Sequence, residues 1–171
     1  SLLFSLPLST FFTIKNFPFK NILISLINAL TSIPPVCAGL VCYLIISRGG
    51  PLGWMGILYT PEAMIIAQFI IITPIMMSLI IRNFQEQYIL FEEEFRAYGA
   101  QFPDIMKLLI VNNYKIYFTI SIVAFGRAIS EYGAAAIVGG SIDQVTRNMS
   151  ATIALETSKG NLDIALQLGF I

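Results

Sequence analysis

The sequence lacks histidine altogether and contains only two cysteines among its 171 residues. Histidine is the commonest general base and the commonest transition-metal ligand, so its absence argues against most acid–base and metal chemistry. Cys37 and Cys42 are five positions apart in an apolar run, which on a helix places them about 140° apart. We interpret them as two buried, inert thiols, not as a metal pair or a local disulfide. The motif G-x-x-x-x-G-K-[ST] is also absent, so the chain has no P-loop of its own with which to hydrolyse ATP.

Charge is scarce, and its two signs cancel. Only 12% of the residues are charged and 56% are hydrophobic, whereas soluble domains average about 25% and about 45–50%. The mean hydropathy of +0.77 excludes an ordinary water-soluble domain, and disorder would need low hydrophobicity with a high net charge. Ten basic and ten acidic residues give no net charge, so nothing points to a nucleic-acid partner. We therefore predict an all-α integral membrane protein whose helices cross a lipid bilayer.

Three apolar runs are long enough to cross a membrane as helices, which takes about 20 residues. They extend from Ile22 to about Ser47, from Glu62 to Ile81, and from about Tyr114 to Val138. Pro34-Pro35 interrupts the first run and Pro74 lies within the second, and we interpret these prolines mainly as packing kinks. Partial spans lie at 2–14 and from about residue 162 onwards. We therefore predict a single transmembrane domain over residues 1–171, a fragment truncated within its first and last spans.

Basic residues are unevenly divided between the two sides of the membrane. Because successive spans alternate in direction, the connections at 15–20 and 82–113 share one side, and those near 48 and at 139–161 share the other. Six basic residues lie in or beside the first pair of connections and three in the second pair. Positive charge favours the cytoplasmic side, so we predict that the long 82–113 segment is a cytoplasmic loop.

Aromatic residues recur through this loop at helical spacing. They stand four, three, four, three and four positions apart: Phe84, Tyr88, Phe91, Phe95, Tyr98 and Phe102. Such a stripe predicts an amphipathic helix, and Gly99 followed by Pro103 predicts a second short helix after a hinge. The stripe fits two roles equally well. It packs against the protein's own spans or in the headgroup region, or it docks a soluble partner.

Within this loop, Glu93 and Gly99 have the identity and spacing found in the EAA loop of type I ABC importer permeases, which the segment resembles. That loop has Glu-Ala-Ala, three further residues and then glycine; here Glu94 and Phe95 replace the two alanines. Asn112-Asn113 stands near the position where many relatives carry a proline. The resemblance implies that the loop inserts into a cleft of a separate ATPase subunit. The coupling residues that it implies are Glu93, Glu94, Ala97, Gly99 and Ala100.

Further motifs are spread over most of the chain: SIPP at 32–35, SRGGPLG at 47–53, YTP at 59–61, AQ at 67–68, FGRAISEYG at 125–133, IVGG at 137–140, TR at 146–147 and IALETSKG at 153–160. Together they resemble the tungstate-type permease subunits, close relatives of the molybdate and sulfate permeases. The resemblance implies a polytopic helix bundle of the type I ABC importer permease (MetI-like) kind, in the inner (plasma) membrane of a bacterium or archaeon. It also implies transport of an oxyanion into the cytoplasm, with tungstate the first expectation and molybdate the next.

The same resemblance implies the partners. They are an ABC ATPase subunit that uses ATP and Mg²⁺, an extracytoplasmic substrate-binding protein, and a second permease copy in a homodimer. The chain itself would bind no cofactor or metal, carry no catalytic residue and not be an enzyme. Three alternatives stay open: a membrane-embedded enzyme, for which the spans offer only Arg127 and Glu131; a non-transporting scaffold or assembly subunit; and a permease for sulfate or another small substrate.

Arg127 and Glu131 stand four positions apart in the third predicted span. A charge at bilayer depth costs about 2.5–3.5 kcal/mol, so such residues usually pair and face protein or water. Either the two residues form an ion pair whose opposite charges neutralise each other, or Arg127 supplies a positive charge to a pathway for an anion. We assign to the predicted pathway Arg127, Glu131, the close-packing Gly133 and Thr152. Thr152 belongs to a hydroxyl-rich segment, 146–157, that either covers the outer mouth or merely caps helices.

Overall fold

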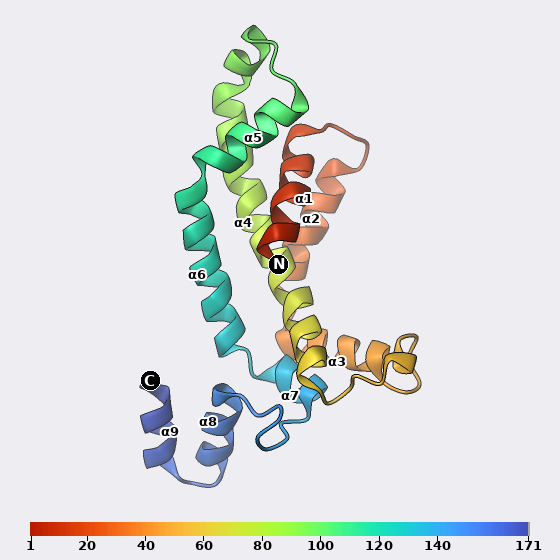
Figure 1. Cartoon of the computed structure of the whole chain (residues 1–171), viewed down its shortest axis with the longest axis vertical. Helices are drawn as coiled ribbons and strands as arrows, with labels where there is room; N and C mark the ends of the chain where they lie inside the picture. The colour runs from red at the N-terminus through yellow and green to blue at the C-terminus, as the bar shows by residue number, and fades with distance from the viewer. Residues whose placement is uncertain (171) are drawn as a thin grey trace. The chain divides into compact units, whose positions relative to one another are not determined.

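The computed structural model describes residues 1–170, except for the side chain of Arg96, and these residues form helices and no β-strand. Figure 1 shows the helices in chain order: α1 (Leu2–Ile14), α2 (Lys20–Thr31), α3 (Pro35–Ile46), the 3-10 helix η1 (Gly53–Met55), α4 (Pro61–Ala97), α5 (Phe102–Asn112), α6 (Tyr114–Ser130), α7 (Gly133–Gly139), α8 (Met149–Ser158) and α9 (Leu162–Gly169). The predicted all-α fold is confirmed.

The chain forms two compact units, each assembled from separate stretches of sequence. The first unit comprises residues 1–32 and 72–126, and the second comprises residues 33–71 and 127–171. Helices α4 and α6 each contribute to both units. The predicted cytoplasmic loop therefore lies in the first unit, and the predicted pathway residues lie in the second.

One helix of the described part of the chain, α4, is by itself long and apolar enough to cross a membrane. The predicted span from Glu62 to Ile81 lies inside it, and Pro74 sits within the helix without ending it. Two further pairs of helices pass the same test together but are sharply bent, α2 with α3 by 103° and α5 with α6 by 66°. Length and composition thus allow up to three spans among the described residues.

Two predicted spans are wrong as continuous helices. The run from Ile22 to Ser47 breaks after Thr31, and α3 begins anew at Pro35. This is more than a packing kink, because Pro34 and Pro35 remove two amide donors and proline disfavours a helical residue before it. The run from Tyr114 to Val138 breaks between α6 and α7.

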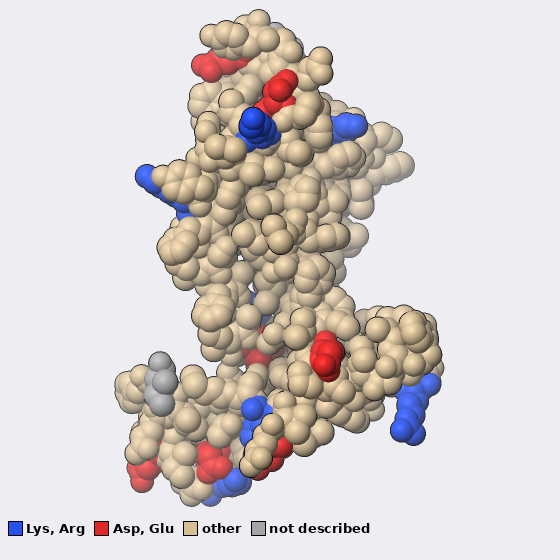
Figure 2. All heavy atoms as spheres, viewed as in Figure 1, with Lys and Arg blue, Asp and Glu red and all other residues tan. Residues whose placement is uncertain are grey.

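In the first unit, helix α1 buries polar residues and exposes apolar ones. Ser5, Ser9 and Thr13, one turn apart, are almost completely buried, whereas Leu3 is 90% exposed. The Ser5 and Thr13 hydroxyls donate to carbonyls four residues earlier in their own helix. Small residues at this spacing let helices approach closely within a membrane, where apolar side chains face lipid. On the face shown in Figure 2, the charged side chains of this unit lie toward the end that carries the α4–α5 turn, and the rest of its helices show almost none.

In the second unit, α3 packs directly on α7 through small residues. A Cβ atom built on Gly39 would lie 2.5 Å from the Cα of Ala134, and one on Gly133 would lie 2.5 Å from a methyl group of Val36. Cys42 is buried beside Ala63, Ala67 and Val138. Cys37 is exposed, so the prediction of a buried thiol holds only for Cys42.

Candidate functional site

The predicted cytoplasmic loop consists of the last turns of α4, a tight turn at Gly99, and α5. The sequence predicts two short helices here, and the first of these is wrong as a separate element: the helix runs on from the membrane span without interruption to Ala97. Gly99 has a φ of 63°, a conformation that glycine adopts at little cost. No described atom lies within 4 Å of the place where its Cβ would stand. Gly99 therefore serves the turn itself, and no close approach of backbone from residues 1–170 requires it.

Helix α5 begins with a complete capping box. Gln101 is the N-cap residue, its side chain accepts from the backbone of Asp104, and the Asp104 carboxylate accepts from the Gln101 N–H at 3.1 Å. Pro103 lies in the first turn, where its missing N–H is no loss. The helix predicted after the Gly99 hinge is therefore confirmed, with a start fixed by its own sequence.

The aromatic stripe is buried along part of α4 and exposed at its end. Phe84 is completely buried, and Phe95 is buried against the rings of Tyr88 and Phe91 at 6.0 and 6.4 Å between centroids. Tyr98, by contrast, is 87% exposed. The stripe packs on the protein itself along α4 and presents an aromatic side chain at the tip of the loop.

The residues predicted to couple to an ATPase lie at this tip. Four of them are exposed and Ala100 is half-buried; the exposed four are Glu93, Glu94, Ala97 and Gly99. A surface of this kind is accessible to a soluble partner. Their role in docking stays a prediction.

The predicted pathway residues lie where α6 ends and α7 begins. Arg127 and Glu131 form an ion pair at 3.9 Å, in which the arginine side chain is 43% exposed and the glutamate side chain 8%. Glu131 also accepts a hydrogen bond from the Ala134 N–H at 3.3 Å, in the first turn of α7. The carboxylate thus has two partners, and it satisfies an α7 amide that the helix itself leaves free.

The segment after α7 is organised by hydrogen bonds from hydroxyls to backbone carbonyls. Thr146 donates to the Gly139 carbonyl at 2.6 Å, Ser150 to that of Ile129 at 2.7 Å, and Thr152 to that of Asn148 at 3.1 Å. These bonds favour the structural alternative for the hydroxyls. A pathway role for Thr152 stays a prediction.

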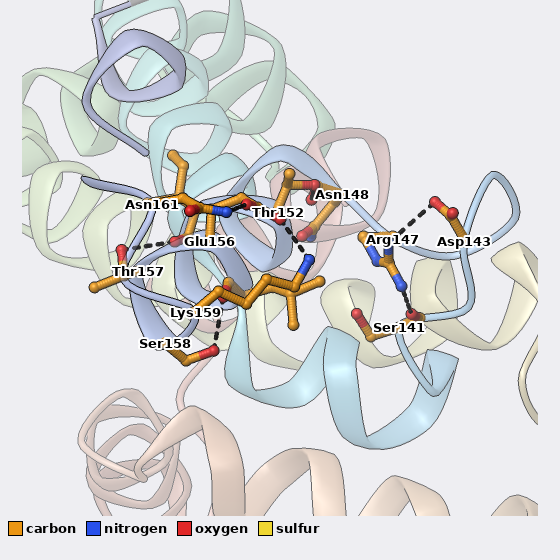
Figure 3. A network of polar contacts seen from close by, with 12 residues as sticks. Ser141, Asp143, Arg147, Asn148, Thr152, Glu156, Thr157, Ser158, Lys159 and Asn161 are labelled. Atoms are coloured by element: carbon orange, nitrogen blue, oxygen red, sulfur yellow. Dashed lines mark hydrogen bonds and ion pairs between the residues drawn. The ribbon is translucent and has the colours of Figure 1, made fainter. Parts of the chain in front are cut away.

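Ionic groups fix the turn between α8 and α9, as Figure 3 shows. Glu156 lies 2.7 Å from the Lys159 amine and accepts from the Asn161 side chain at 2.7 Å. These two partners lower the pKa of the Glu156 carboxyl below its ordinary value. Before α8, Arg147 pairs with Asp143 at 3.1 Å. The two basic residues of this segment, Arg147 and Lys159, therefore each pair with an acidic residue of the same segment.

Taken together, apolar helices with buried small residues and an exposed charged loop indicate an integral membrane protein with a loop accessible to solvent. No family profile matches the chain. It is 38% identical over 168 residues to the tungstate uptake system permease protein TupB of Peptoclostridium acidaminophilum, which covers 98% of this chain and 73% of the relative. A probable anion ABC transporter permease of Haloferax volcanii is 35% identical, covering 97% of this chain and 74% of the relative. The TupB protein of Campylobacter jejuni is 35% identical, covering 91% and 65%. The chain belongs to the family of anion ABC transporter permeases that includes the tungstate permeases.

Proposed function

We propose that this chain is the membrane-spanning subunit of an ATP-driven importer that carries tungstate into the cytoplasm, with molybdate the next candidate. The observation that carries the proposal is the similarity to tungstate uptake permeases over nearly the whole chain. The exposed tip of the α4–α5 loop supports it, because such an importer needs a surface for its ATPase. ATP and Mg²⁺ would be bound by that ATPase subunit, and this chain would carry out no hydrolysis.

The proposed complex contains two permease copies, ATPase subunits and an extracytoplasmic binding protein, in the inner (plasma) membrane of a bacterium or archaeon. Its test is reconstitution of the complex in lipid vesicles. We expect the tungstate-loaded binding protein to raise ATP hydrolysis and to drive tungstate across the membrane. Loading with molybdate or sulfate tests the choice of anion. Hydrolysis that responds to no loaded binding protein would favour the scaffold alternative and contradict the proposal.

We further propose that Arg127 lies on the anion's route. Its guanidinium has five N–H donors, and its recorded partner among the described residues is the Glu131 carboxylate at 3.9 Å. The neighbouring carboxylate would weaken the positive site without abolishing it, so that an anion is attracted but released. Glu131, Gly133 and Thr152 are proposed as its neighbours along that route.

The proposed orientation makes a direct prediction for labelling with a membrane-impermeant thiol reagent. In a Cys37→Ser background, which removes the exposed native thiol, Glu86→Cys should react only from the cytoplasmic side. Trp54→Cys and Asp143→Cys should react only from outside, because their connections lie on the side with fewer basic residues. The Trp54 and Asp143 side chains are well exposed, so accessibility within the chain does not limit the reaction. Labelling of Glu86→Cys in intact cells would reverse the orientation.

A further inference from the structure

The base of the α4–α5 loop is closed by a reciprocal pair of side-chain amides. The Asn113 amide donates to the Gln87 side-chain oxygen at 2.7 Å, and the Gln87 amide donates back to the Asn113 side-chain oxygen. The two residues are 26 positions apart, one on α4 and the other at the junction of α5 and α6. Asn113 is only 3% exposed. In such a buried position a two-way amide pair fixes both the distance and the orientation of its helices.

The same group holds the end of α5. Asn113 also donates to the Leu109 carbonyl at 2.6 Å, and the Tyr117 hydroxyl donates to that carbonyl at 2.9 Å. The last carbonyls of a helix have no partner within it, so these two donors satisfy a group that α5 leaves open. The Tyr117 ring in turn meets the buried Phe84 ring of α4 at 6.1 Å, edge to face. One cluster therefore joins α4, the end of α5 and the start of α6.

We propose that this cluster, which we call the amide clamp (Gln87, Asn113, Leu109 and Tyr117), transmits movement of the loop to the membrane helices. The inference rests on the proposed coupling function of the loop. A partner that moves the exposed tip acts on 88–112, and the clamp ties both ends of that segment together. With the clamp closed, α4 and α6 must move with the loop as one body. With the clamp open, the tip can rotate about its two backbone connections and leave the spans in place. Gln87 and Asn113 are thus positioning residues that do not themselves touch the transported anion.

The test removes the clamp without leaving a buried amide unpaired. The double variant Gln87→Met with Asn113→Leu keeps the approximate shape of both side chains and deletes both hydrogen bonds between them. It also removes the hydrogen bond from Gln87 to the Asn83 side-chain oxygen and the one from Asn113 to the Leu109 carbonyl, which keeps the Tyr117 hydroxyl as a donor. In reconstituted vesicles with the ATPase and the loaded binding protein, we expect the variant to retain its ATPase subunits and its basal hydrolysis. Stimulation of hydrolysis by the loaded binding protein should fall about fivefold or more, the size of a typical coupling between sites. Anion transported per ATP should fall as well.

Two neighbouring residues provide matched controls. Gln85→Met makes the same chemical change two residues before Gln87, and Asn112→Leu makes the same change one residue before Asn113. Neither side chain forms a hydrogen bond within the described part of the chain, and Asn112 is exposed. Both controls should keep wild-type stimulation. If the loaded binding protein stimulates ATP hydrolysis in the double variant as it does in the wild type, the proposed role of the amide clamp is contradicted. A double variant that loses its ATPase subunits or fails to insert would also contradict that role, because the pair would then serve assembly and not transmission. A wild-type complex without stimulation would instead overturn the proposed function and the clamp's role with it.

Discussion

Gly39→Leu should prevent correct folding of the second unit and abolish transport. A Cβ on Gly39 would lie 2.5 Å from the Cα and 2.9 Å from the Cβ of Ala134, and these atoms belong to the body of α7 and cannot swing aside. The helices would have to separate, which would also withdraw Val36 from Gly133. Overpacking of this kind costs about 1–3 kcal/mol or more, and a leucine adds three carbon atoms beyond the Cβ.

The measurement is the yield and melting temperature of the purified protein in detergent, followed by uptake in vesicles. Gly39→Ala should show a smaller loss in the same direction. Gly126→Ala is the matched control, because no described atom stands within 4 Å of a Cβ at Gly126 in α6. Equal behaviour of Gly39→Ala and Gly126→Ala would mean that the close contact between α3 and α7 does not exist in the membrane.

The spans were predictable from hydropathy where a single helix carries the whole apolar run, and α4 is the example. The ends of helices were less predictable, because they depend on neighbours distant in sequence. The ion pair of Glu131 with Arg127 was predicted and is present, but the continuous span around it was wrong, because the Glu131 carboxylate also accepts from the Ala134 N–H at the start of a new helix. A side chain that competes for backbone donors in this way breaks a helix without changing its hydropathy.

The candidate site was predictable to the extent that it is local in sequence. The aromatic spacing predicted a helix, and the Gly99 turn with the start of α5 followed from residue types alone. The amide clamp was not predicted, because Gln87 and Asn113 become neighbours only when α5 folds back on α4. The one sequence signal was Asn112-Asn113 at a place where many relatives carry a proline. That signal marked a departure from the pattern but gave no indication of the partner on α4.

Changing Arg127 and Glu131 together should leave the protein folded and stop most of the uptake. The double variant Arg127→Gln with Glu131→Gln removes both charges. No unpaired charge is then left buried, and a buried unpaired charge is what makes the loss of one partner strongly destabilising. The side-chain amide that Glu131→Gln introduces still offers an oxygen to the Ala134 N–H, which now donates to the Glu131 carboxylate at 3.3 Å. The start of α7 should therefore survive. If the guanidinium attracts the anion, uptake should fall about tenfold, equivalent to about 1.4 kcal/mol, while ATPase subunits stay bound.

The single variants separate this role from a purely structural one. Arg127→Gln leaves the Glu131 carboxylate 8% exposed with the Ala134 N–H as its remaining recorded partner, so its stability should fall, and its uptake with it. In a structural role, the second change, Glu131→Gln, would restore melting temperature and uptake together, because the two losses would have one cause. In the pathway role, the second change restores the melting temperature alone. Radioactive or mass-spectrometric measurement of tungstate uptake, alongside a melting curve of the same preparation, distinguishes the two. Normal uptake by the double variant would contradict a role for Arg127 on the anion's route. The ion pair would then serve only to end α6 and begin α7.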